Sequence, residues 1–116
     1  MSYGKKVWIF PDAELPPLGV NVIPGHESVI ITNVTNEVAK IKFTLLYEDK
    51  EPKTFTTEVG AMRVRCMRSN RVEDFCDCTA VEGEQYAIML LILPLYQPFN
   101  INYLLYSNLA FRHKIL

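Results

Sequence analysis

Apolar and polar residues alternate most clearly in the middle of the chain, from Ala39 to Tyr47. Ile41, Phe43 and Leu45 fall on one side of an extended strand, and lysine and threonine side chains fall on the other. This period of two is typical of a β-strand with one face in a core and the other in solvent. We therefore expect a central strand here, with these three apolar side chains buried.

Six further segments carry β-branched and aromatic residues between turn signals. No segment offers a capped amphipathic helix of about 12 residues, and although residues 101–111 allow helical periodicity, their composition favours a strand. Short strands with regular turns predict a sandwich or barrel. We expect an all-β, antiparallel β-sandwich of about seven short strands, as a single domain over residues 1–116. The six segments are Lys6–Phe10, Ser28–Val34, Lys53–Val59, Met62–Ser69, Gln85–Leu93 and Ile101–Leu109.

Two long connections separate these strands. Pro11 is expected to end the first strand, and Asp12–Glu27 then forms a loop that holds three prolines and two glycines. Its apolar residues predict a loop packed on the domain, and loops of this length are usually functional or disordered. The second connection is Asn70–Glu84.

Composition narrows the class of protein. The 116 residues are 49% hydrophobic and 22% charged, which is typical of one folded domain. With a net charge of −1, the protein as a whole does not attract nucleic acid or an anionic membrane electrostatically. The longest apolar run, Ala87–Leu95, is too short to span a bilayer. We expect a cytoplasmic protein without membrane insertion, and the odd number of cysteines argues against a disulfide framework.

Four arginines lie close together at Arg63, Arg65, Arg68 and Arg71. A guanidinium group can donate two parallel hydrogen bonds to a phosphate or a carboxylate. The cluster is therefore a candidate site for an anion or an acidic partner. The alternative is a solvated strand edge, whose charges prevent edge-to-edge pairing.

Acidic residues and a histidine flank the long loop: Asp12 and Glu14 open it, and His26 and Glu27 close it. Such groups could perform acid–base chemistry if they converged in a cleft. The commoner interpretation is that His26 or Glu27 hydrogen-bonds the backbone of the loop. Binding contacts at Glu14, His26 and Glu27 are the remaining possibility.

Three cysteines suggest a metal site, but their spacing argues against it. Cys76 and Cys78 are separated by one residue, whereas structural zinc sites usually place two to four residues between thiolates. Cys66 and His26 would have to complete the set. We therefore expect no metal and no Cys76–Cys78 disulfide.

Aromatic residues are plentiful, with Trp8 and six tyrosines among them. They suit sugar stacking or protein interfaces, although packing within a sheet is their usual role. The chain has no glycine-rich phosphate loop and no nucleophile–base motif. We therefore expect a binding protein without a cofactor, not an enzyme.

Several short motifs lie between Trp8 and Asn70. None of them is diagnostic alone, but their order along the chain is. They are Trp8, Glu14-Leu15-Pro16-Pro17, His26-Glu27, Ile31-Thr32-Asn33, Tyr47-Glu48-Asp49-Lys50-Glu51-Pro52, the Val59, Ala61 and Arg63 pattern, and Arg68 with Asn70. In this order they resemble the family of soluble sensory rhodopsin transducers of cyanobacteria and their bacterial relatives. Beyond Met89 the chain is more apolar than that family and lacks its Arg-Leu-Asp segment.

The resemblance implies a β-sandwich, a homotetramer and a soluble binding or signalling role, with no catalytic residues to transfer. Sugar-like small molecules and DNA have been considered as ligands of the family. Our leading hypothesis is a homo-oligomer that recognises a small molecule or a signalling protein, through the long loop and the arginine cluster. The alternatives are a carbohydrate-active hydrolase that uses the loop carboxylates and a DNA-binding regulator that uses the arginines.

Self-association also has a reason in the residues themselves. No charged residue occurs between Gln85 and Phe111. Leu90 to Leu93 are apolar on both faces of their strand, so one face needs a covering beyond the domain core. We expect a closed symmetric oligomer to provide it.

Overall fold

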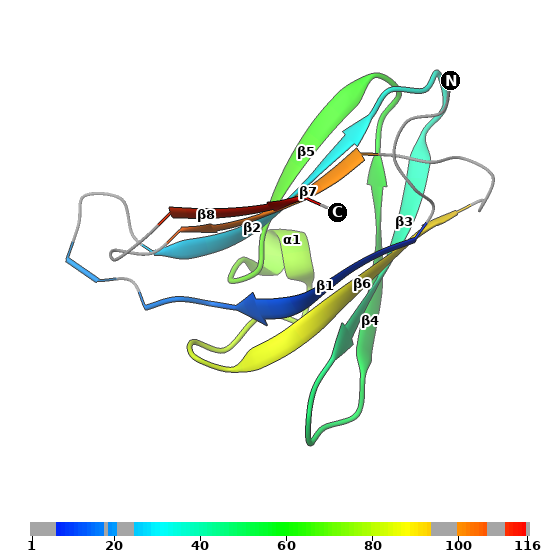
Figure 1. Cartoon of the computed structure of the whole chain (residues 1–116). Coiled ribbons are helices and arrows are strands. Elements are labelled where there is room, and N and C mark those ends of the chain that lie inside the picture. The colour runs from blue at the N-terminus through cyan, green and yellow to red at the C-terminus, as the bar shows by residue number, and fades with distance from the viewer. Residues whose placement is uncertain (1–6, 18, 21–24, 94–99, 107–110, 116) are drawn as a thin grey trace.

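Two four-stranded antiparallel sheets enclose the core (Figure 1). The computed structural model describes residues 7–17, 19–20, 25–93, 100–106 and 111–115. The first sheet has the order β1-β6-β3-β4 and the second has the order β5-β2-β7-β8, which confirms the antiparallel sandwich. The strands are β1 (Val7–Glu14), β2 (His26–Asn33), β3 (Ala39–Leu46), β4 (Lys53–Val59), β5 (Arg63–Arg68), β6 (Gln85–Leu93), β7 (Asn100–Tyr106) and β8 (Phe111–Ile115).

β3 is the central strand that its alternation predicts. It pairs with β4 on one side and with β6 on the other. Ile41, Phe43 and Leu45 are buried, which confirms the expectation for this segment. The Phe43 ring stacks on Phe55 of β4 with 4.6 Å between centroids, so aromatic packing adds to the burial of apolar area.

β1 continues through Pro11, contrary to the expectation that this proline ends the strand. The pairing of β1 with β6 shifts register between Phe10 and Ala13, so Pro11 falls in an irregularity. β1 is also an edge strand of its sheet. Proline lacks the N–H of a ladder bond, and edges and bulges are the places that tolerate it. The strand therefore resumes at Ala13 and ends at Glu14.

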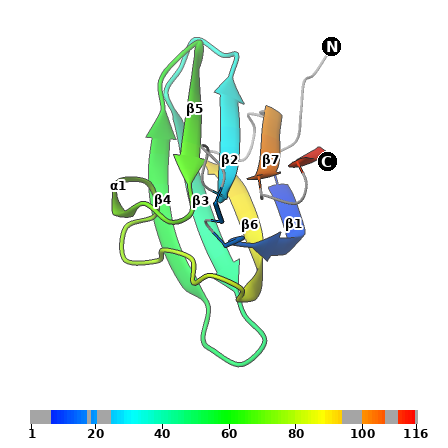
Figure 2. The same cartoon turned by 90° about the vertical axis from the view of Figure 1, so that its left-hand side faces the viewer.

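A helical turn interrupts the connection that was expected to be a loop over Asn70–Glu84. The helix α1 (Val72–Phe75) is only four residues long and places Phe75 in the core. The Phe75 ring lies 5.2 Å from that of Phe55 and 5.7 Å from that of Phe43. Figure 2 shows α1 beside β4 and β5, where the two sheets diverge, so α1 closes that side of the sandwich.

Asn33 at the end of β2 ties the two sheets together. Its side-chain amide nitrogen lies 2.8 Å from the carbonyl of Glu37, 3.1 Å from that of Val59 and 3.0 Å from that of Gly60. Its amide oxygen accepts the N–H and the hydroxyl of Thr35 at 3.0 and 2.8 Å. Since Val59 ends β4 in the other sheet, one buried amide joins a turn to both layers.

Candidate binding site

Glu27 lies on the inner face of β2 and is fully buried. One of its carboxylate oxygens accepts a hydrogen bond from the Tyr86 hydroxyl on β6, and the other accepts the main-chain N–H of Glu14 at 2.8 Å. The Glu27 carbonyl accepts the N–H of Ser69 at 3.1 Å. The side chain therefore closes the base of the long loop, as expected of a residue that hydrogen-bonds loop backbone.

The described part of the long loop packs on the domain only near its two ends, and Val20 is 99% exposed, contrary to the expectation for this apolar residue. Leu15 and Pro16 are buried, and so is Gly25. A Cβ atom at Gly25 would collide with the carbonyl oxygen of Pro17. Glycine at this position therefore lets the two arms of the loop approach each other.

The loop is shorter than the expected Asp12–Glu27, because β1 extends to Glu14 and β2 begins at His26, and the other polar residues at its ends are placed differently from Glu27. Asp12 is exposed, and its Oδ1 accepts a hydrogen bond from Nε2 of Gln85 at 2.7 Å. Glu14 and His26 are half-buried at the ends of their strands. A glycosidase needs two carboxylates that both reach the substrate. Glu27 does not reach solvent in this structure, so a pair of catalytic carboxylates would have to consist of Asp12 and Glu14.

The arginine cluster does not form one surface. Arg63 and Arg65 pair in register with Asn33 and Ile31, whose side chains are buried on the inner face of β2. Val64 is instead 63% exposed on the outer face. Arg65 is half-buried on β5, which is an edge strand of its sheet, so the interpretation of a charged strand edge stays a prediction.

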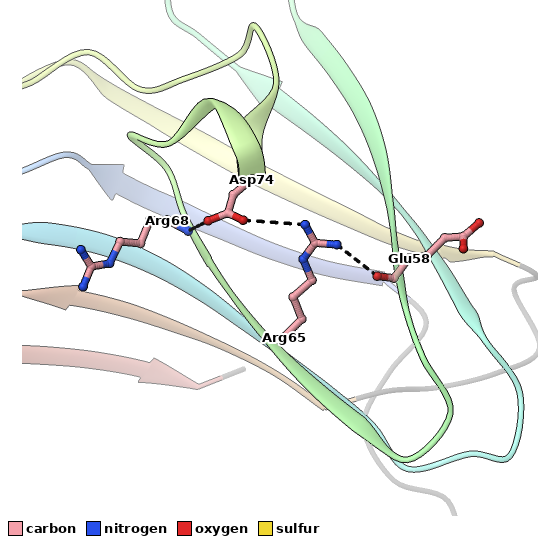
Figure 3. Close-up of polar contacts among 4 residues, drawn as sticks. All are labelled: Glu58, Arg65, Arg68 and Asp74. Atoms are coloured by element: carbon pink, nitrogen blue, oxygen red, sulfur yellow. Dashed lines mark hydrogen bonds and ion pairs between the residues drawn. The ribbon is translucent and has the colours of Figure 1, made fainter.

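Arg65 bridges elements from both sheets (Figure 3). Its Nη2 lies 3.7 Å from Oδ1 of Asp74 in α1, and its Nη1 donates to the carbonyl of Glu58 on β4 at 3.3 Å. Arg63 donates to the carbonyl of Met62 in its own turn at 3.1 Å. Both guanidinium groups therefore serve local structure.

Arg68 and Arg71 have different surroundings. The main-chain N–H of Arg68 donates to Oδ2 of Asp74 at 2.9 Å, while the Arg68 side chain points away from that carboxylate in Figure 3. Arg71 is exposed at the start of α1. Neither guanidinium forms an ion pair with a described acidic side chain. An anion site in this region would therefore depend on these two residues.

An open hollow of about 290 Å³ lies where β1, β3 and β6 meet, next to the irregularity in β1. Its walls combine apolar surface with amide, carboxylate and phenol groups. Tyr86 lies in this wall, so the hollow adjoins the buried contact with Glu27. The lining residues are Pro11, Leu46, Tyr47, Glu48, Gln85, Tyr86 and Ala87.

Tyr47 is fixed in the wall by two neighbours. Its ring stacks against Tyr86 with 6.2 Å between centroids, and the Lys50 ammonium lies 4.2 Å from its centroid. Lys50 also pairs with Glu84 at 2.9 Å. Burial raises the pKa of the Tyr47 phenol, so this group stays a neutral hydrogen-bonding group at physiological pH.

Sequence reasoning singled out the two tyrosines of the wall as part of an aromatic set, but it missed Glu48 and Gln85. Gln85 begins β6 and Glu48 follows β3, far apart in the chain. They meet because β6 pairs with β3. Only knowledge of this non-local pairing could have indicated them.

The cysteines are free thiols in different environments. Cys66 and Cys76 are exposed and Cys78 is buried. Burial, and then the hydrogen bond with Asp77, raise the pKa of the Cys78 thiol. Within the described ranges, no three His, Cys, Asp or Glu side chains are grouped as metal ligands. No described helix is long and apolar enough to cross a membrane.

The fold defines an all-β protein of the sandwich class. Residues 3–92 match the family described as the Anabaena sensory rhodopsin transducer, and the chain belongs to that family. The family supports a non-catalytic, signalling-type role. The match ends close to Met89, beyond which the sequence departs from the family pattern.

Solved structures of two proteins share the fold. The crystal structure of Thermotoga maritima 1070 superposes with a TM-score of 0.72 at 24% identity, covering 97% of this chain and 91% of that one. The Anabaena sensory rhodopsin transducer gives 0.69 at 24% identity, covering 87% of this chain and 96% of that one. No curated protein matches the sequence.

Proposed function

We propose that this chain is a homo-oligomeric signalling protein that recognises a small polyhydroxylated, sugar-like molecule in the hollow beside Tyr47. The observation that carries the proposal is the composition of that wall. One Gln85 amide N–H is bonded to Asp12, so Gln85 offers its other N–H and its carbonyl oxygen. Glu48 is an exposed acceptor, and Tyr47 offers a hydroxyl. Sugar hydroxyls both donate and accept, so they match such a mixed set.

The size and the apolar surface of the hollow fit the same class of ligand. Small-molecule sites usually occupy about 300–1,000 Å³, and about 290 Å³ suits a ligand of one sugar ring. Pro11, Leu46 and Ala87 offer apolar contact to the C–H face of such a ring. Glu27 contributes from beneath, because its bond to Tyr86 fixes that wall.

Titration of the isotope-labelled protein with a panel of monosaccharides, followed by amide NMR, tests this proposal. We expect saturable shifts at Glu48, Gln85 and Ala87, and their loss in Gln85→Ala and Glu48→Ala. Thr56→Ala, on the exposed face of β4, is the matched control and should bind normally. Absence of saturable shifts with every sugar would contradict the proposal.

Self-association is the second part of the proposal. It is supported by the uncharged stretch between Gln85 and Phe111. The resemblance to the family suggests a tetramer. Light scattering should give a mass several times the 13.3 kDa of one chain, and a stable monomer would contradict this part.

A role for the arginines in binding an anion or an acidic partner now depends on Arg68 and Arg71, because Arg65 is engaged with Asp74. Arg68→Ala with Arg71→Ala should lower such binding while leaving the fold intact. Arg65→Ala should instead loosen the contact between α1 and β4. Unchanged phosphate and DNA binding in the double variant would remove both the anion-site and the DNA-binding alternatives.

A further inference from the structure

The outer face of the first sheet carries an apolar area that we call the outer patch. Val7 and Ile9 on β1 are 44% and 47% exposed, and Leu46 on β3 is 38% exposed. Ala87, Met89 and Leu91 on β6 lie half-buried between them. The register makes the patch continuous, since Val7 pairs with Leu91, Ile9 with Met89 and Leu46 with Ala87.

The width of the outer patch matches one helix. Neighbouring strands lie about 4.8 Å apart, so three strands span about 10 Å from the first axis to the third. A helix with its side chains is about 10–12 Å across. An amphipathic helix could therefore lay its apolar stripe on β1 and β6. One flank of the helix would then lie over β3, where Leu46 is apolar and Lys40, Lys42 and Thr44 are polar. Docking of such a helix is a common way for a partner protein to bind.

Two lysines border the outer patch on β3. Lys40 and Lys42 are exposed on the same face, and Lys42 lies in the same row as Val7 and Leu91. Neither lysine forms an ion pair with a described acidic side chain, although Glu58 lies opposite Lys40 in register. A partner with carboxylates beside its apolar stripe would complement this border.

We infer that the outer patch docks an amphipathic α-helix of a partner protein, with acidic residues of that helix beside Lys40 and Lys42. A second copy of the chain would bring the same two lysines to the contact, and like charges oppose it. A lipid surface fits less well, because the patch is aliphatic and lacks the tryptophan and tyrosine typical of membrane interfaces. The docking surface shares Leu46 and Ala87 with the hollow of the sugar-binding proposal, but it rests on different observations, so either proposal can fail without the other.

Two synthetic peptides of about 18 residues, or five helical turns, test this assignment. Both carry the same leucine stripe, which is flanked by glutamates in one and by lysines in the other. Fluorescence anisotropy with the full chain should show that the acidic peptide binds at least about tenfold more tightly than the basic one. The double variant K40E/K42E should reverse that preference, since both lysines are exposed and the fold should remain.

Ile9→Glu should abolish binding of the acidic peptide, whereas Val81→Glu should not. Val81 is 58% exposed in a loop outside the patch and controls for the added charge. Circular dichroism and light scattering accompany each variant. Equal binding of both peptides, or a preference that K40E/K42E leaves unchanged, would overturn the inference.

Two further results would overturn the inference, because each would show that something other than a partner helix covers the outer patch. Dissociation of an oligomer by Ile9→Glu would show that a second copy covers the patch. Binding to phosphatidylcholine vesicles that contain phosphatidylglycerol, without binding to the acidic peptide, would assign the patch to a lipid surface. If the protein bound the acidic peptide but no sugar, the proposed function would fail and this inference would stand.

Discussion

Both ends of the inner face of β2 carry a buried polar side chain, and the two are held in different ways. At one end Glu27 only accepts, from the Tyr86 hydroxyl and the Glu14 N–H. At the other end Asn33 donates to carbonyls and also accepts from Thr35. Val29 and Ile31 between them are fully buried. The apolar middle supplies burial, and the polar ends fix how the two sheets are aligned.

The different hydrogen-bond partners determine which side chain each end of β2 can tolerate. Glu27 meets two donors, so a carboxylate suits it, and an amide would place an N–H against one of them. Asn33 meets carbonyl oxygens, so an amide suits it, and a carboxylate would place negative charge among them. Buried polar groups that are fully satisfied specify one arrangement of a core, whereas partly satisfied groups destabilise it.

The largest effect is expected when the Glu27 carboxylate is removed. Glu27→Ala would leave the Tyr86 hydroxyl and the Glu14 N–H without their acceptor and would open a cavity, at a cost of about 3–5 kcal/mol. Glu27→Gln keeps the volume and should cost less. Urea unfolding measures both, and a Glu27→Ala variant as stable as the parent would show that this end does not fix the sheets.

A somewhat smaller loss, about 2–4 kcal/mol, is expected for Asn33→Ala, because several main-chain groups lose their partner. Asn33→Asp sharpens the comparison through pH. The surrounding carbonyls should raise the pKa of the introduced carboxyl in the folded state. Its stability should therefore be highest below about pH 4 and fall as pH rises, relative to the parent. A pH-independent difference would contradict this account.

Tyr86→Phe tests one bond of the Glu27 end. It removes the hydroxyl that donates to the carboxylate and leaves the Glu14 N–H in place. Hydrogen bonds to charged groups contribute about 1.5–3 kcal/mol, so the loss should be smaller than for Glu27→Ala. Combining the two substitutions in a double-mutant cycle should show strong coupling, and simple additivity would count against the bond.

The smallest effect is expected at Ser69, whose main-chain N–H bonds the Glu27 carbonyl. Its buried hydroxyl has no partner among the described residues. Ser69→Ala should therefore change the free energy of unfolding by less than about 0.5 kcal/mol or stabilise the protein. A loss above about 1 kcal/mol would indicate that the hydroxyl has a partner. The polar contacts at this end of β2 would then include more than the hydrogen bonds of the Glu27 carboxylate.

The alternation in β3 was sufficient to predict its burial, because one face of that strand meets the core along its whole length. β5 does not follow this rule, because its inner positions Arg63 and Arg65 are charged while Val64 on the outer face is apolar. Arg65 lies at the margin of the core and reaches Asp74 and a β4 carbonyl, so its polar end is satisfied. A rule that places every charged residue on the solvent-facing side of a strand cannot predict a charged side chain at the margin of a core.

The candidate site was less predictable for a related reason. Thr35 is a partner of Asn33 and lies only two residues after it, so a local turn at this position is predictable from the sequence. The Tyr86 partner of Glu27 and the meeting of Glu48 with Gln85 depend on how β6 pairs. Pro11 shows the same dependence, because only its edge position lets the strand continue. Single-sequence patterns carry no information about which strands become neighbours.

The pairing of β1 with β6 has a consequence for the order of folding. β1 is the first described strand, and its ladder partner comes only after β2 to β5. Closing so large a loop is entropically costly, and folds dominated by distant pairings reach the native state slowly, in about milliseconds to seconds. We expect the two pairs of strands that are neighbours in the sequence, β3 with β4 and β7 with β8, to form first. β1 would then dock late, so its amides should gain hydrogen-exchange protection last.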